Sequence, residues 1–180
     1  MNDAKRTREE SDELHSTSRS AESADRQLYG HPRERPRTLP GGDLLAEGFH
    51  TDVRARQHTI VIDEPEVLGG TTDTGASPIE AVLAGLMSCH VINYQVWAAK
   101  LGIVVDSVSV EADGDIDLLG FFGIDPDVRA GYGEIRLTVA LDGPESRETY
   151  AALADAVDAH CPVLDNLRNP VPVTRALVDK

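Results

Sequence analysis

The chain has no long hydrophobic run, few cysteines and no excess of basic side chains. No segment approaches the roughly 18 uninterrupted apolar residues that indicate a membrane-spanning helix. The charged N-terminus is not followed by an apolar run, so it does not resemble a secretory signal peptide. We therefore expect a cytoplasmic protein that does not insert into a membrane.

Cysteine is limited to Cys89 and Cys161. A reducing cytoplasm disfavours a permanent structural disulfide, so any pairing of the two should be transient. Their wide separation excludes a C-x-x-C motif or a local zinc knuckle. Each is next to a histidine, His90 or His160, but neighbouring helical side chains point about 100° apart and rarely converge on one ion. We predict neither a metal site nor a bound cofactor.

Basic charge is scarce beyond residue 40. Residues 1–40 contain eight Lys or Arg and eight Asp or Glu, and residues 41–180 contain nine and twenty-three, so the whole net charge of −14 belongs to the second segment. An acidic surface repels phosphate backbones and anionic lipids. Nucleic acid and membrane surfaces are therefore not expected as partners.

The composition divides the chain into two parts. Residues 1–40 are rich in Ser, Arg and Glu, contain three prolines near their end and show no pattern that buries a face. Such a segment cannot offset the entropy of ordering, so we predict a disordered tail. Residues 41–180 are predicted to form one domain.

The pattern of apolar and polar residues predicts an α+β order within this domain. Cys161 should end the second helix, because Pro162 disfavours helical geometry in the residue before it. The expected elements are two strands within 48–63, a loop over 64–76, a helix over 77–102, a strand over 103–117, a loop over 118–132, a strand over 133–143, a helix over 144–160, and a turn with a last strand over 166–178.

The helix over 77–102 has a distinct start and an unusual surface. Ser77, Pro78 and Glu80 occupy the N-cap, first and third positions of a capping box. Apolar side chains then surround almost the whole helix, which indicates burial by a sheet or by a second subunit. Cys89, near its middle, is open to two interpretations: an inert buried thiol or a reactive one.

Two segments carry a resemblance to a known family. They are GGTTDTGASPIEAVLAGLMSCHV, residues 69–91, and HCPVLDNLRNPVPV, residues 160–173. Their order and separation resemble the OsmC-like family of osmotically inducible and organic hydroperoxide resistance proteins. The intervening GFFGIDPDVRAGYGEIRL, residues 120–137, is also similar. The resemblance covers about residues 50–175.

The resemblance implies a fold, an activity and partners. The fold is α+β, with curved antiparallel sheets wrapped around long central helices in an interlaced homodimer. Cys89 would be the peroxidatic and Cys161 the resolving cysteine in the reduction of an organic hydroperoxide. An external dithiol reductant, rather than a bound cofactor, would reopen the resulting disulfide. Phe121 and Phe122 are candidates for an apolar lining that favours organic peroxides, and ordinary core packing is the alternative.

The resemblance also implies an arginine, held by a glutamate, that activates the peroxidatic thiol. The best-characterised branch of the family has its glutamate directly after the proline, where this chain has Ile79. Glu80 is one position later and is either this glutamate or only a helix cap. Arg54, Arg56 and Arg168 are candidates for the arginine, and we favour Arg56.

A protein of a different class would also fit these residues. With an activating pair that departs from the family pattern, the same fold could act as a redox sensor or bind an apolar ligand without turnover. The intact cysteine pair favours the enzyme.

Overall fold

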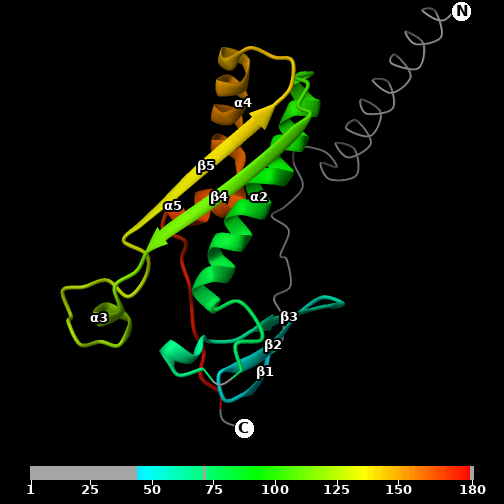
Figure 1. The fold of residues 1–180 in the computed structure, drawn as a ribbon. Coiled ribbons are helices and arrows are strands. Elements are labelled where there is room, and N and C mark those ends of the chain that lie inside the picture. Colours follow the sequence, from blue (N-terminus) through cyan, green and yellow to red (C-terminus); the bar gives the residue numbers. More distant parts are fainter. Residues whose placement is uncertain (1–43, 71, 179–180) are drawn as a thin grey trace, which may run out of the picture. The chain divides into compact units, whose positions relative to one another are not determined.

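The computed structural model describes residues 44–70 and 72–178 (Figure 1). The predicted disordered tail, residues 1–40, lies outside them. The chain forms two compact units, and the boundary between them follows Gly85, inside the long helix α2 (Pro78–Leu101). Within the described residues, no helix combines the length and apolar character that a bilayer span requires.

The first unit contains a three-stranded antiparallel sheet in the order β1–β2–β3. The strands are β1 (Leu44–Glu47), β2 (His50–Ala55) and β3 (His58–Ile62). The two strands expected within 48–63 are therefore confirmed, and β1 is an additional strand. Arg56 lies in the tight turn between β2 and β3, with a φ of 58°.

A loop with a short 3-10 helix, η1 (Glu66–Leu68), connects β3 to α2, as its glycine-rich sequence predicts. A Cβ on Gly70 would lie 1.5 Å from the carbonyl oxygen of Glu64, so only glycine fits there. The loop is also organised by the fully buried Asp63. Its carboxylate accepts hydrogen bonds from the Thr72 hydroxyl and, at 3.1 Å, from the Thr74 backbone N–H.

The start of α2 confirms the predicted capping box. The Glu80 carboxylate accepts hydrogen bonds from the Ser77 backbone N–H and from the Ser77 hydroxyl, both at 2.8 Å. The Ser77 hydroxyl in turn accepts a bond from the Glu80 N–H at 3.3 Å. Reciprocal bonds of this kind satisfy backbone donors that the first helical turn leaves without partners.

The second unit packs helices against a two-stranded antiparallel sheet. Its strands β4 (Ser107–Asp115) and β5 (Glu134–Asp142) confirm the two predicted strands and alternate between exposed and partly buried residues. In Figure 1 the sheet crosses α2 and α4 (Arg147–His160). The core between these elements consists of Tyr94, Ala98, Leu153 and Val157, with Val108, Val139 and Leu141 of the sheet packed against it.

The two remaining helices are short. One turn of helix, α3 (Leu118–Phe121), lies in the predicted loop after β4. The other, α5 (Pro162–Arg168), follows α4 after the single non-helical residue Cys161. The prediction that α4 ends at Cys161 is therefore confirmed, whereas Pro162 begins a new helix.

The prediction of a last strand within residues 166–178 is wrong. Residues 162–168 are helical, and residues 169–178 belong to no helix or strand of the described chain. The apolar and polar alternation in this tail is compatible with a strand, but a strand also needs hydrogen bonds from a neighbouring one. None of the described strands pairs with it.

Candidate active site

The two cysteines, far apart in the sequence, meet in the second unit. Cys89 lies on α2 and Cys161 at the junction between α4 and α5. The Cys161 thiol donates a hydrogen bond to the Cys89 sulfur at an S–S distance of 3.2 Å, and both thiols are free. A small apolar cluster holds the pair, made of Leu86, Leu164, Ile135, Leu137 and Val163.

Burial distinguishes the two thiols. Cys89 is only partly buried within one chain. Cys161 has an exposed fraction of 0%. Burial raises the pKa of Cys161, the hydrogen bond with Cys89 raises it further, and the backbone N–H of Leu164 partly opposes both.

A polar network lies behind Cys161. The fully buried His90 places Nδ1 3.6 Å from the Cys161 sulfur and Nε2 3.5 Å from a carboxylate oxygen of Asp158. The contact with Asp158 has the length of an ion pair without the geometry of a hydrogen bond. The other Asp158 oxygen accepts a hydrogen bond from Arg168 at 3.0 Å. The network thus draws one residue each from α2, α4 and α5.

Asn93 contacts Cys89 directly. Its side-chain amide donates to the Cys89 carbonyl oxygen at 2.9 Å and lies 3.4 Å from the Cys89 sulfur. The two residues are four positions apart on α2, the spacing that puts side chains on one helix face. Such a donor can stabilise negative charge on the sulfur. Sequence reasoning did not select Asn93, although this spacing was the signal that could have found it.

The sequence-predicted activating residues belong to the first unit or to the helix junction. Glu80 is exposed and engaged by Ser77, whose backbone hydrogen bond is the main cause that lowers the pKa of the Glu80 carboxyl. Arg56 is exposed in the β2–β3 turn. Arg168, another candidate for the activating arginine, lies on α5 and pairs with Asp158 of α4. The structure leaves the catalytic roles of Arg56 and Glu80 as predictions.

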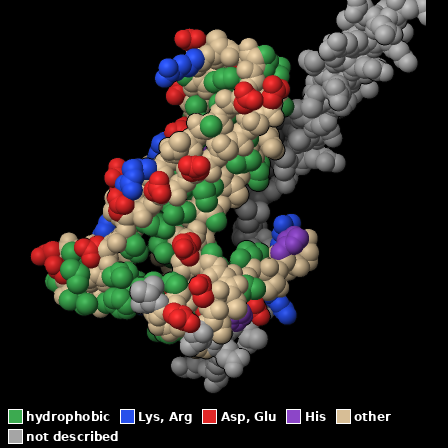
Figure 2. All heavy atoms as spheres, in the orientation of Figure 1, with side chains coloured by type: hydrophobic (Ala, Val, Ile, Leu, Met, Phe, Trp, Pro, Cys, Tyr) green, Lys and Arg blue, Asp and Glu red, His purple; other side chains and the backbone are tan. Residues whose placement is uncertain are grey.

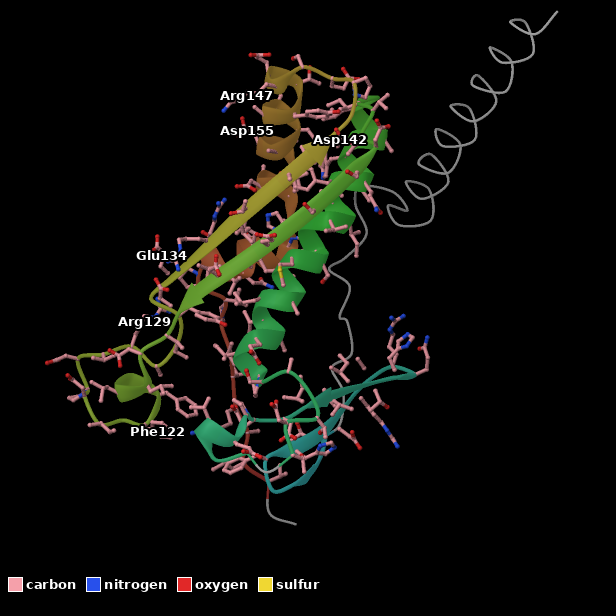
Figure 3. All side chains as sticks on the ribbon, in the orientation of Figure 1. Phe122, Arg129, Glu134, Asp142, Arg147 and Asp155 are labelled. Atoms are coloured by element: carbon pink, nitrogen blue, oxygen red, sulfur yellow. The ribbon has the colours of Figure 1, made fainter. Side chains whose placement is uncertain are left out.

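Charged and apolar side chains are distributed unevenly over the surface. On the face shown in Figure 2, acidic side chains far outnumber basic ones, as the composition predicts. The labelled Glu134 and Asp142 lie at the two ends of β5, and Asp155 and Arg147 on α4 (Figure 3). Phe121 and Phe122 are more than half exposed and stack edge to face on each other, so the core-packing alternative for them is wrong.

Comparison with protein families identifies the class. The chain matches the family described as OsmC-like protein over residues 70–175, more than half of its length. This chain belongs to the OsmC-like family, as its motifs predicted. No curated protein matches the chain.

Similar solved structures support the same α+β fold. An OsmC-like protein from Mycoplasma pneumoniae is 21% identical, with a TM-score of 0.62 over 74% of this chain and 91% of that one. An organic hydroperoxide resistance protein from Elizabethkingia anophelis, crystallised with thiocyanate, is 19% identical, with a TM-score of 0.59 over 76% and 93%. The Legionella pneumophila organic hydroperoxide resistance protein OsmC is 18% identical, with a TM-score of 0.55 over 73% and 92%.

Proposed function

We propose that this protein reduces organic hydroperoxides to alcohols with Cys89 and Cys161. The observation that carries the proposal is the 3.2 Å contact between two free thiols that come from different elements. A disulfide bond is about 2.05 Å long, so a closure of roughly 1 Å would join them. Membership of a family that includes organic hydroperoxide resistance proteins supports a peroxide as the oxidant.

The difference in burial supports the proposed roles of the two cysteines. Cys89 is partly exposed and can meet a peroxide, whereas Cys161 is shielded. A Cys89 thiolate attacks the O–O bond, the alkoxide leaves and takes up a proton as the alcohol, and the sulfur becomes a sulfenic acid. Asn93 lies where its amide would hydrogen-bond to the thiolate.

Cys161 would then resolve the sulfenic acid. Its sulfur bonds to the Cys89 sulfur and water leaves, which protects Cys89 from irreversible oxidation. An external dithiol reductant, reacting by thiol–disulfide exchange, would return both cysteines to the reduced state. No bound cofactor takes part in this cycle.

Arg56 and Glu80 are our proposed activating pair for the Cys89 thiolate. Both hydrogen bonds from Ser77 end on the same Glu80 oxygen, Oε2, so capping uses one of the two carboxylate oxygens. The other can accept a hydrogen bond from an arginine. Capping and arginine binding are therefore compatible in one residue.

We also propose that the protein acts as an interlaced homodimer. Within one chain, α2 fully buries only Leu86, His90, Tyr94 and Ala98, a single stripe with a spacing of four residues. On another face, Ile92 and Val96 are 59% and 43% exposed. They lie three and seven residues after Cys89, the spacing that shares a helix face. A second copy that covered this face would lie beside the reactive sulfur.

The test is stopped-flow consumption of cumene hydroperoxide by the reduced protein. We expect rapid loss of one equivalent of peroxide per subunit, and none beyond background in Cys89→Ser. Cys161→Ser should still consume one equivalent but should accumulate a sulfenic acid, which dimedone traps, instead of an intramolecular disulfide.

The same experiment tests the second candidate, a redox sensor or apolar-ligand binder. The departure of Ile79 from the family pattern, which leaves no glutamate directly after the proline, favours this candidate. Consumption by the wild type no faster than by Cys89→Ser would refute the peroxidase and leave sensing or binding as the function.

A further inference from the structure

His90 is a fully buried titratable residue without a part in the cycle described above. His90 lies beside Cys161, whose attack on oxidised Cys89 requires the loss of a proton. Burial raises the pKa of Cys161, so its sulfur carries a proton at neutral pH, whereas the thiolate is the nucleophile in disulfide formation. The attack of Cys161 on oxidised Cys89 therefore needs a proton acceptor, and His90 Nδ1 is 3.6 Å from the Cys161 sulfur.

A role as proton acceptor for Cys161 requires the neutral ring to carry its proton on Nε2. An unprotonated Nε2 would place its lone pair 3.5 Å from the negatively charged Asp158 carboxylate, and the two would repel each other. A proton on Nε2 removes this repulsion and leaves the Nδ1 lone pair facing the Cys161 thiol at 3.6 Å. The Leu86 carbonyl oxygen, 3.1 Å from Nδ1, favours the opposite tautomer, so the proposal requires that the charge of Asp158 outweighs this contact. Once Nδ1 gains a proton, it can donate to the Leu86 carbonyl oxygen at 3.1 Å. Both nitrogens of the protonated ring then face an acceptor oxygen.

We propose that His90 accepts the Cys161 proton during disulfide formation and that Asp158, held by Arg168, orients the ring. The inference rests on the proposed function and adds a residue to it. As the Cys161 and Cys89 sulfurs bond, the S–O bond of the sulfenic acid breaks and its electron pair leaves with the hydroxyl. That hydroxyl takes the proton from His90 and departs as water. This division of roles follows the logic of nucleophile, base and orienting carboxylate.

The experiment isolates the Cys161 step with an aromatic disulfide, dithiodipyridine, in place of a peroxide. Cys89 attacks the probe and releases one pyridinethione, and Cys161 then attacks the mixed disulfide and releases a second. The first release reports on Cys89 and the second on Cys161. Because the probe contains no peroxide, the result is independent of whether the protein reduces hydroperoxides.

We expect His90→Gln to leave the first release within about twofold and to slow the second about 100-fold at neutral pH, in the range of general-base catalysis. Asp158→Asn should slow the second release about tenfold, because the amide keeps an acceptor but not the charge. The matched control is His160→Gln, since this exposed histidine is next to Cys161 in sequence and bonds to the Ala156 carbonyl oxygen. It should change neither release.

The pH dependence separates proton transfer from a structural role. In His90→Gln the second release should rise about tenfold per pH unit as bulk base forms the Cys161 thiolate, and should approach the wild-type rate at high pH. Besides Cys161, the ring faces Asp158, which pairs with Arg168, and Asp158 also acts on Tyr94, whose pKa burial raises. An unchanged second release in His90→Gln, or equal slowing of both releases at every pH, overturns the proposal.

Discussion

Asp63 is a buried carboxylate whose ionisation contributes to folding. The hydrogen bond from Thr72, followed by that from the Thr74 backbone, lowers its pKa from 3.8 to about 2. A folded-state pKa below the unfolded one stabilises the protein above the unfolded value, and this stability is lost as the pH falls through the folded value. The contribution should therefore be complete above about pH 4 and decline between about pH 4 and pH 2.

Replacing Asp63 tests this contribution. Asp63→Asn should be less stable than the wild type at neutral pH, and the difference should narrow as the pH falls from about 4 to 2. Urea unfolding across that range measures it. Asp73→Asn is the matched control, because Asp73 is exposed in the same loop and asparagine tolerates its φ of 45°. If the free energies of unfolding of Asp63→Asn and the wild type differ by the same amount at all pH values, the ionisation of Asp63 does not contribute to stability.

At the same scale, the sequence located the cysteines but not their surroundings. The two motifs identified Cys89 and Cys161, and the structure places their sulfurs in contact. The roles of His90 and Asp158 could not be predicted, because the two residues lie on α2 and α4 and only tertiary packing brings them together. The relative burial of the two thiols was likewise set by packing.

At the scale of elements, hydrophobic periodicity was sufficient for β4, β5 and α4, which are long enough to show a period. The helix α2 is apolar on almost all sides, and its capping box and length located it instead. Periodicity was insufficient for α5, which has only seven residues. Pro162 carried two signals: it ends α4, and proline also favours the first position of a new helix. The prediction used only the first signal.

The capping box of α2 gives a prediction that separates stability from activity. Ser77→Ala should lower the free energy of unfolding by about 1 kcal/mol, because both hydrogen bonds of the Ser77 hydroxyl are lost. Glu80→Gln should lower the free energy of unfolding by less than half as much as Ser77→Ala, since glutamine also forms capping boxes. If Glu80 holds the activating arginine as proposed, Glu80→Gln nevertheless slows peroxide consumption several-fold.

Urea unfolding and stopped-flow peroxide consumption, measured on the same preparations, make this comparison. An unchanged rate in Glu80→Gln would restrict Glu80 to its role as a cap. A loss of stability in Glu80→Gln as large as that in Ser77→Ala would instead contradict the assumption that glutamine preserves the cap.

At the scale of the whole molecule, the exposed apolar face of α2 predicts association. We expect the wild type to sediment as a dimer at micromolar concentration and Ile92→Asp to sediment as a monomer with slower peroxide consumption. Leu101→Asp is the matched control, because Leu101 is 49% exposed on the same helix but about 180° around it from Ile92. A dimer that persists in Ile92→Asp would place the subunit interface elsewhere.

The complete burial of Cys161 also makes it a native reporter of local opening. A neutral alkylating reagent can reach Cys89 in the folded protein, but it reaches Cys161 only when the junction between α4 and α5 opens. In Cys89→Ser, the alkylation rate therefore measures how often this junction opens, in the way that amide exchange does for a buried N–H. The alkylation rate of this one thiol can thus follow local opening of the second unit without an added label.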